Sequence, residues 1–425
     1  MLDGEPFPVF VSRMVRRFVT TLTPPRARLA LLALALGGFG IGATEFVAMG
    51  LLPNLAQDLL PDLYANSPAV ANARAGSLVS AYALGVVVGA PTIAALAARF
   101  PRKLLLLVLV AAFTIGTVAS ALLPSFGLVL AARFVAGLPH GAYFGVAALV
   151  AASIMGPGKR GQGVALVLSG LTIANVIGVP TITYLGQVTS WRIAYLVVAA
   201  IFAATFVAIA YLVPFQPGDP DATMRRELRA FGRIQVWLAL LIGAVGFGGF
   251  FAVYTFISPL ITEVTRLGPG FVPVVLVVVG VGMTLGNFLG GWTADRNVMG
   301  SIFTYFGLFV IALTGLALTA QSTAGLLVFV FLIGFAASAL SPAIQTRLMD
   351  VAGDSQTLAA AVNHASLNLG NALGALLGGV TIAAGFGYVS PTWVGLILCA
   401  PGIALAVTAM VLQRRRVPEP VLVRA

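Results

Sequence analysis

Long apolar stretches alternate with short polar connectors along almost the whole chain. Windows of about 19 residues, bounded by charges, prolines and glycines, predict twelve membrane-spanning helices. The first six cover residues 29–53, 75–97, 103–123, 126–153, 163–187 and 191–214, and the second six cover 235–262, 271–294, 301–320, 324–346, 357–384 and 390–413. Apolar stretches of about 20 residues favour helices over the strands of a membrane barrel, in which polar and apolar residues alternate. The pattern therefore predicts an all-α membrane protein.

Composition excludes a soluble enzyme. Of the 425 residues, 59% are hydrophobic and only 9% are charged, against about 25% charged residues in an ordinary soluble domain. The net charge of +11 does not indicate nucleic-acid binding, because the basic residues lie between the apolar spans and not on one face. The single cysteine, Cys399, excludes a disulfide framework and a metal site built from cysteines.

Charges between the spans predict how the chain is organised in the membrane. We expect a cytoplasmic N-terminal segment (1–28), a six-helix bundle (29–214), a cytoplasmic linker (215–234), a second six-helix bundle (235–413) and a cytoplasmic tail (414–425). With both termini inside, only Arg74, Arg192 and Arg266 of the 24 lysines and arginines fall outside. This asymmetry predicts a multi-pass protein of the inner membrane with both termini in the cytoplasm.

An internal repeat relates the two predicted bundles. Gly85, Gly89 and Arg99 recur 197 residues later as Gly282, Gly286 and Arg296, and Asn175 and Gly178 recur 196 residues later as Asn371 and Gly374. Glycines at such positions are typical of close contact between helices. Two similar bundles leave a site between them that opens to either side of the membrane, which is the architecture of a carrier.

Several motifs resemble those of one transporter family. The segment from Gly291 to Arg296 reads G-W-T-A-D-R and is similar to the major facilitator superfamily signature, in its second-half copy. The first-half copy keeps Arg99 and Arg102 but has Ala98 and Pro101 where the family usually has aspartate and glycine. By these residues the chain is identified as a member of the major facilitator superfamily.

Three further motifs narrow the resemblance. Arg133 lies in an element similar to the family's arginine motif of span four, and Gly178-Val-Pro180 resembles the glycine/proline motif of the drug:proton antiporters. Residues 42–53 and 366–374 are similar to arabinose-efflux and chloramphenicol-efflux-like members. The resemblance implies the twelve-span drug:proton antiporter branch. It also implies that Arg99, Arg102, Gly178, Pro180, Gly291, Asp295 and Arg296 control the change of conformation. In the family, the aspartate of this motif helps to hold the outward-facing state through charge contacts. Because the first copy has Ala98 instead, the resemblance implies that such contacts would rely here on Asp295 or on the basic residues.

Glu45 is the only acidic residue within the apolar body of a span. It lies 8 residues before Pro53, and Arg133 lies 8 residues after Ser125, so both are about 12 Å from the outer ends of their helices. Charges inside a membrane are costly and usually functional. We therefore expect Glu45 to carry the coupled proton and Arg133 to act on it. His140, seven residues after Arg133 on nearly the same helix face, is a candidate proton relay. A static Glu45–Arg133 pair and a packing role for His140 are the structural alternatives.

Candidate substrate contacts are aromatic and amide side chains. Phe247, Phe251 and Tyr254 form one stripe on span seven, as suits an apolar ligand pocket. Asn175, Asn371 and His364 offer polar contacts, with packing and helix-to-helix hydrogen bonds as the alternative readings. The two histidines have no carboxylate at ligand spacing, so no metal site is expected. No catalytic constellation or ATP-binding loop is present in the sequence, so no enzymatic activity or cofactor is expected and energy should come from a proton gradient.

These features together predict a monomeric, proton-coupled antiporter that exports small, largely apolar or amphipathic drug-like compounds by alternating access, as in multidrug efflux and antibiotic resistance. An exporter of sugars or other small metabolites is the alternative, because Asn175, Asn371 and His364 could bind hydroxyl groups. A non-transporting membrane receptor and a channel are further alternatives. The expected partners are a small-molecule substrate, protons and the lipid bilayer, and no nucleic acid.

Overall fold

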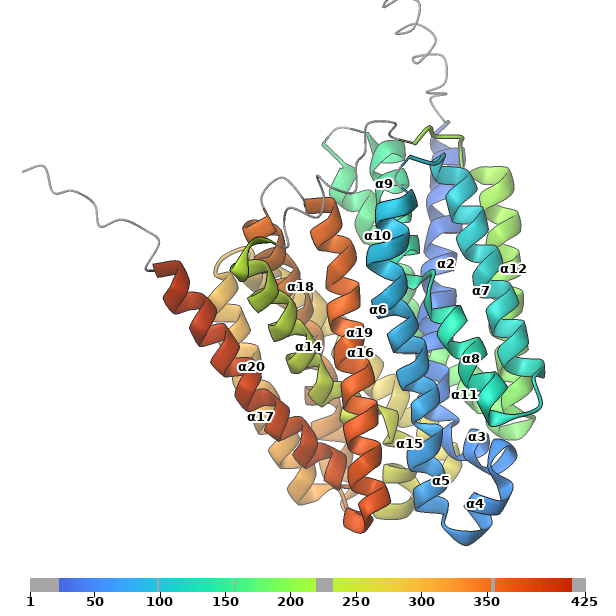
Figure 1. Cartoon of the computed structure of the whole chain (residues 1–425), viewed down its shortest axis with the longest axis vertical. Helices are drawn as coiled ribbons and strands as arrows, with labels where there is room; N and C mark the ends of the chain where they lie inside the picture. The colour runs from blue at the N-terminus through green and yellow to red at the C-terminus, as the bar shows by residue number, and fades with distance from the viewer. Residues whose placement is uncertain (1–22, 98, 157, 219–231, 353–355, 415–425) are drawn as a thin grey trace, which may run out of the picture.

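The computed structural model describes residues 23–97, 99–156, 158–218, 232–352 and 356–414. Twelve helices within these ranges are long and apolar enough to cross a membrane, and the described residues contain no strand (Figure 1). The predicted all-α fold is therefore confirmed. Most of the predicted linker, together with residues 1–22 and 415–425 of the predicted terminal segments, lies outside the described residues.

The first six spans are built from the following helices: α2 (Pro24–Gly50), α5 and α6 (Pro68–Ala75, Ser77–Ala97), α7 (Arg102–Leu122), α8 and α9 (Phe126–Gly137, His140–Met155), α10, η1 and α11 (Arg160–Ile173, Ala174–Gly178, Val179–Val188), and α12 (Trp191–Leu212). Two short helices, α3 (Leu52–Leu59) and α4 (Pro61–Asn66), connect the first span to the second.

The second six spans are α14 (Ile234–Thr255), α16 (Val272–Ala294), α17 (Val298–Thr319), α18 (Thr323–Ala352), α19 with η5 (Gln356–Thr381, Ile382–Phe386) and α20 (Ser390–Arg414). Span seven differs most from its predicted range of 235–262. Its α-helix ends at Thr255, and the short elements α15 (Ile257–Pro259), η3 (Leu260–Val264) and η4 (Pro269–Phe271) lead into α16.

The helices form two groups that meet along their length. Within the first half α2 packs on α10 and α12, and within the second half α14 packs on α19 and α20. Contacts between α6 and α19 and between α11 and α16 join the halves. We call the end where α12 ends and α14 begins the linker end, and the opposite end the far end. In Figure 1 the linker end is at the top, where α2 also begins and α20 ends.

Glycines of the internal repeat make equivalent contacts in the two halves. A Cβ added at Gly85 or Gly89 of α6 would meet the backbone carbonyls of Phe134 or Leu138, in and directly after α8. A Cβ at Gly282 or Gly286 of α16 would meet the carbonyls of Phe331 or Phe335 in α18. At these positions only glycine lets the backbones approach this closely.

Gly286→Ala is expected to destabilise the protein, whereas Gly291→Ala is not. The added methyl group at 286 would press on the Phe335 carbonyl, but apart from the surrounding helix backbone no described atom lies within 4 Å of a Cβ at Gly291 in the same helix. Overpacking of this kind costs about 1–3 kcal/mol. Thermal unfolding of both purified variants checks the prediction. Equal midpoints for the two would show that the α16–α18 contact does not require glycine.

Candidate functional site

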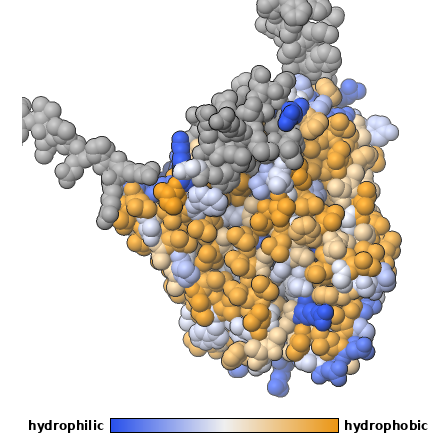
Figure 2. Space-filling model, viewed as in Figure 1, coloured by the Kyte–Doolittle hydropathy of each residue, from blue (hydrophilic) through white to orange (hydrophobic). Residues whose placement is uncertain are grey.

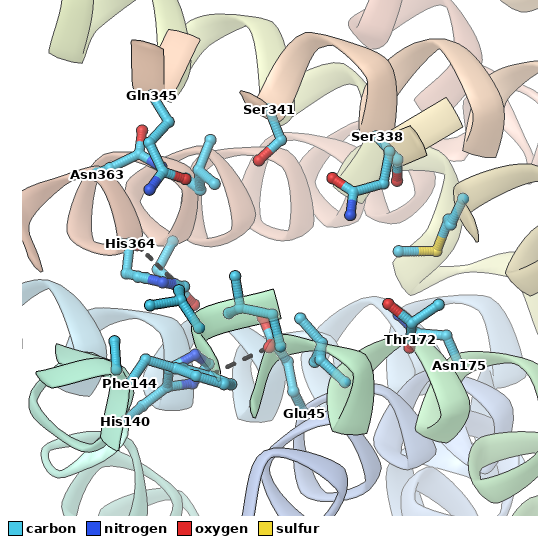
Figure 3. A pocket seen from close by; sticks show the side chains of 18 of the residues that line it. Glu45, His140, Phe144, Thr172, Asn175, Ser338, Ser341, Gln345, Asn363 and His364 are labelled. Carbon is cyan, nitrogen blue, oxygen red and sulfur yellow. Dashed lines mark hydrogen bonds and ion pairs between the residues drawn. The ribbon is translucent and has the colours of Figure 1, made fainter. Parts of the chain in front are cut away.

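A cavity of about 410 Å³ lies between the two halves. Its lining residues come from α2, α9, α10 and η1 in the first half and from α14, α16, α18 and α19 in the second. Figure 3 shows side chains of both halves pointing into this space. A cavity between two bundles is where a carrier is expected to hold its substrate.

Glu45 lies at the base of the cavity and connects the two halves. Its side chain is buried, with 5% of the residue exposed. Oε1 accepts a hydrogen bond of 3.1 Å from Nδ2 of Asn371 in α19. Oε2 lies 4.0 Å from Nδ1 of His140 in α9 (Figure 3). The carboxylate of span one is thus held by an amide from the opposite half and faces a histidine from its own half.

Arg133 does not pair directly with Glu45 in this structure. Its Nη1 instead donates to the backbone oxygen of Thr44 at 3.0 Å and to the Thr44 hydroxyl oxygen at 3.2 Å. The guanidinium also lies over the ring of Tyr82, 4.4 Å from its centre. Among the described residues no carboxylate lies within 4.0 Å of Arg133. The static Glu45–Arg133 pair is therefore wrong for this conformation, because the arginine is held by the residue that precedes Glu45.

His140 lies in a buried cluster with Tyr82, Phe144 and His364, which the sequence did not predict as a cluster. Its Nδ1 lies 3.1 Å from the hydroxyl oxygen of Tyr82. The ring of His364 lies 5.8 Å from that of His140 and stacks on Phe144 at 5.1 Å between ring centres. Tyr82 and Phe144 were missed because nothing in their sequence surroundings distinguishes them from packing aromatics. The predicted residues Glu45, Arg133 and His140 do lie together, linked through Thr44 and Tyr82.

Only some of the predicted substrate contacts line the cavity. Phe247, Phe251, Asn175 and His364 do. Tyr254 does not: it is 2% exposed, and its ring packs edge-on against Phe46 at 5.6 Å and stacks on Phe250 at 5.0 Å. Asn371 is fully buried and donates to Glu45. These two residues lie beyond the cavity base, so their arrangement does not support direct contact with a substrate.

Contacts between the halves close the far end of the site. Nδ2 of Asn72 donates to the hydroxyl oxygen of Tyr388 at 2.8 Å, and the hydroxyl of Ser80 donates to the Ala372 carbonyl at 3.2 Å. Phe46 stacks on Phe251 at 6.2 Å. Residues at the cavity base are buried, whereas Leu149, on the cavity wall towards the linker end, is 38% exposed. The described residues thus place the opening of the cavity at the linker end.

The predicted conformational-motif residues lie outside the cavity. At the linker end, Nη1 of Arg102 donates to Oε1 of Gln216 at 3.4 Å. Nη1 of Arg296 donates to the Trp292 carbonyl at 2.8 Å, and its guanidinium lies over the Trp292 ring. The carboxylate of Asp295 forms no ion pair with a described residue. Arg99 and Gly291 are also in this region, whereas Ala98 lies outside the described residues. Among the described residues, Asp295 thus makes no charge contact that could hold the outward-facing state.

Gly178 and Pro180 lie at the end of a π-helical turn in span five. This turn, η1 (Ala174–Gly178), is followed directly by α11. A Cβ at Gly178 would meet the ring of Phe39 in α2 at 2.5 Å. Asn175, in the same turn, has its backbone oxygen against Gly280 of α16, so this irregular turn lies at the junction of the two halves.

The two helical bundles enclose a cavity that has polar side chains at its base and is open at one end. This is the arrangement of a membrane transporter. The model of the Major Facilitator Superfamily matches residues 34–319 and 269–425. The chain belongs to this superfamily, as the sequence motifs predicted, and it is a transporter and not an enzyme.

Relatives agree with this assignment along most of the chain. The chain is 39% identical over 393 residues to the inner membrane transport protein YdhP of Escherichia coli K12, covering 92% of this chain and 98% of that protein. It is 32% identical over 382 residues to a chloramphenicol resistance protein of Streptomyces lividans, covering 89% and 95%. Among solved structures, a bacterial homologue of the human lysosomal transporter Spinster, in an inward-facing and unoccupied conformation, shares the fold with a TM-score of 0.70 at 16% identity, covering 94% of this chain and all of that chain.

The twelve apolar helices and the inner-membrane relative support a multi-pass protein of the inner membrane. Figure 2 shows apolar side chains over much of the surface between the two ends, as contact with a lipid bilayer requires. The fold therefore implies a small-molecule substrate and a lipid environment.

Proposed function

We propose that this chain is a proton-coupled antiporter that exports small amphipathic, drug-like compounds by alternating access, with both termini in the cytoplasm, and that it works as a monomer. The observation that carries the proposal is the position of Glu45. The only acidic residue within the apolar body of a span lies at the base of the cavity and is hydrogen-bonded across the junction of the two halves.

Protonation of Glu45 changes the strength of this junction. A hydrogen bond to a charged group contributes about 1.5–3 kcal/mol and a neutral one about 0.5–1.5 kcal/mol. Loss of the negative charge therefore weakens the Asn371–Glu45 bond by about 1 kcal/mol, which is enough to shift a balanced equilibrium about fivefold. In the proposed cycle, a proton from the far side binds Glu45 and allows the protein to change from the conformation open at the far end to the one open at the linker end. The proton leaves Glu45 when substrate enters from the linker end.

The chloramphenicol resistance relative supports a drug-like substrate, and the polar residues of the cavity support an alternative. Asn175 and His364 line the space and can hydrogen-bond hydroxyl groups. An exporter of sugars or other small metabolites is therefore the second candidate function.

Transport into proteoliposomes tests the proposal. A pH gradient imposed across the membrane should drive accumulation of chloramphenicol, ethidium or a pentose against its own gradient, and collapse of the pH gradient should release it. Chloramphenicol or ethidium as the driven compound favours drug export, and the pentose favours the second candidate. Accumulation that does not depend on the pH gradient would refute proton coupling. Binding without any transport would point to a receptor.

A further inference from the structure

The two walls of the cavity differ in chemistry. Above the base, towards the linker end, the wall from α9 and α10 is largely apolar: Leu149, Ala152, Val164, Leu168 and Leu171 line it, and Thr172 adds a hydroxyl group. The opposite wall, from α16, α18 and α19, includes Met283, Met349 and Leu367 but also carries hydroxyl and amide groups along its length: Asn287, Ser338, Ser341, Gln345, Asn363 and Asn368. Figure 3 shows Ser338, Ser341, Gln345 and Asn363 on the side facing Glu45, His140 and Phe144. A ligand between these walls meets an apolar face on one side and a hydrogen-bonding face on the other.

The polar wall presents an acceptor without a partner. Asn368 is 4% exposed, and its Nδ2 donates to the backbone oxygen of His364 at 3.0 Å in the same helix. This bond fixes the orientation of the amide. The Oδ1 atom is buried and accepts no hydrogen bond from a described residue. Asn363 on the same wall and Asn175 in η1 on the opposite side, 1% and 4% exposed, also have a buried Oδ1 without a partner among the described residues.

A buried acceptor that lacks a donor is unfavourable unless a ligand or water supplies one. These side chains line the cavity, so O–H or N–H groups of a bound molecule can fill this role once a small shift of the side chain exposes the amide oxygen to the cavity. The same residues favour ligands with donors over purely apolar ligands, because binding of an apolar molecule would leave the amide oxygens unpaired.

The charges around the cavity select against anions. Among the described residues that line it, Glu45 is the only acidic one and none is a lysine or arginine. An anionic ligand would thus meet a carboxylate at the base and no described cation on the walls, which is unfavourable.

From these observations we infer that the cavity takes an amphipathic molecule without negative charge, with hydroxyl or N–H donors along one edge and an apolar group on the opposite edge, as in an aryl glycoside. Its donors lie on the α16–α18–α19 wall and its apolar group lies on the α9–α10 wall. The inference rests on the proposed function only in treating this cavity as the transport site.

Ligand binding to the full chain in lipid nanodiscs tests the inference without any proton gradient. The probes are phenyl β-D-glucoside, phenyl β-D-glucuronide with an added carboxylate, glucose without the apolar group, and tetraphenylphosphonium without donors. We expect the glucoside to bind at least about tenfold more tightly than the glucuronide or glucose. Equal binding of the glucoside and the glucuronide, or no detectable binding of the glucoside, would overturn the inference.

Variants test the two walls separately. Asn368→Leu should weaken glucoside binding about threefold to tenfold and leave tetraphenylphosphonium binding unchanged. Asn66→Leu is the matched control, because the Asn66 amide makes the same kind of bond to an oxygen four residues earlier, at the exposed far end. Leu168→Asn should weaken glucoside binding by removing apolar contact. If Asn368→Leu and Leu168→Asn both bind the glucoside like the wild type, the assignment of the walls is wrong.

Because these measurements use no gradient, they remain informative if antiport fails. Selective glucoside binding in a protein that shows no proton-driven transport would refute the proposed function and support the inference. Proton-driven transport of donor-free cations alone would support proton coupling and refute the inference.

Discussion

Glu45→Gln is expected to abolish export driven by a pH gradient while leaving exchange of substrate across the membrane intact. Glutamine keeps the size of the side chain and an oxygen that can accept the hydrogen bond from Asn371. It cannot take up or release a proton, so the cycle has no step at which the gradient enters. We expect accumulation in proteoliposomes to fall by about 100-fold or more, with substrate–substrate exchange reduced only severalfold.

Glu263→Gln is the control for this prediction. It makes the same chemical change at an exposed acidic residue outside the cavity, where the Thr262 hydroxyl donates to Oε1. It should transport like the wild type. Gradient-driven accumulation that survives in Glu45→Gln would remove Glu45 from the coupling mechanism, and loss of exchange as well would indicate that the residue holds the two halves together.

Gly280→Val is expected to shift the protein away from the conformation that opens at the linker end. A Cβ at Gly280 in α16 would meet the backbone oxygen of Asn175 and lie 3.1 Å from the Cα of Val176. These atoms belong to the other half, so the clash arises only while the halves meet there. An overpacking cost of about 1–3 kcal/mol changes the ratio of two conformations by about 5- to 150-fold.

Spin labels at cysteines introduced for Asp62 and Arg266, in a Cys399→Ala background, report the separation of the two halves at the far end. Both positions are exposed. The distance between the labels should lengthen in Gly280→Val. Gly282→Val provides the comparison, because a Cβ there meets the Phe331 carbonyl of the same half; it should lower thermal stability without lengthening the distance. An unchanged distance in Gly280→Val would show that this contact does not hold the far end closed.

The twelve spans could be predicted because a helix surrounded by lipid must be apolar along its length, and this is visible in the local sequence. Span two was predicted from residue 75, and the structure starts its apolar helical region at Pro68, where Ser67 caps α5. The irregular end of span seven was less predictable, because the change from α14 to α15 and η3 depends on tertiary packing around buried Phe256 and Leu260.

Glu45 could be identified from sequence, since an isolated carboxylate in an apolar stretch is conspicuous. Its partner could not. Asn371 lies 326 residues away and contacts Glu45 only because α2 and α19 meet at the junction of the halves. Because Glu45 and Arg133 lie at equal depths in their spans, the sequence correctly predicted that Arg133 is near span one. Depth alone does not distinguish a contact with Thr44 from one with Glu45.

The aromatic stripe illustrates a second limit of sequence patterns. Helical spacing places Phe247, Phe251 and Tyr254 on one face of α14, but that face extends past the base of the cavity. Phe247 and Phe251 line the space, whereas Tyr254 packs against Phe46 beyond it. Periodicity identifies a shared face and carries no information on where along that face the cavity ends.

Substrate binding is expected to displace the proton from Glu45, and proton release on ligand binding measures this most directly. Phenyl β-D-glucoside and tetraphenylphosphonium would be added in turn to the purified protein in weakly buffered solution, with a pH indicator recording the protons released. We predict release from the wild type with at least one of these ligands and none from Glu45→Gln, at ligand concentrations that saturate both proteins. Saturating binding without release from the wild type, or equal release from both proteins, would contradict the account.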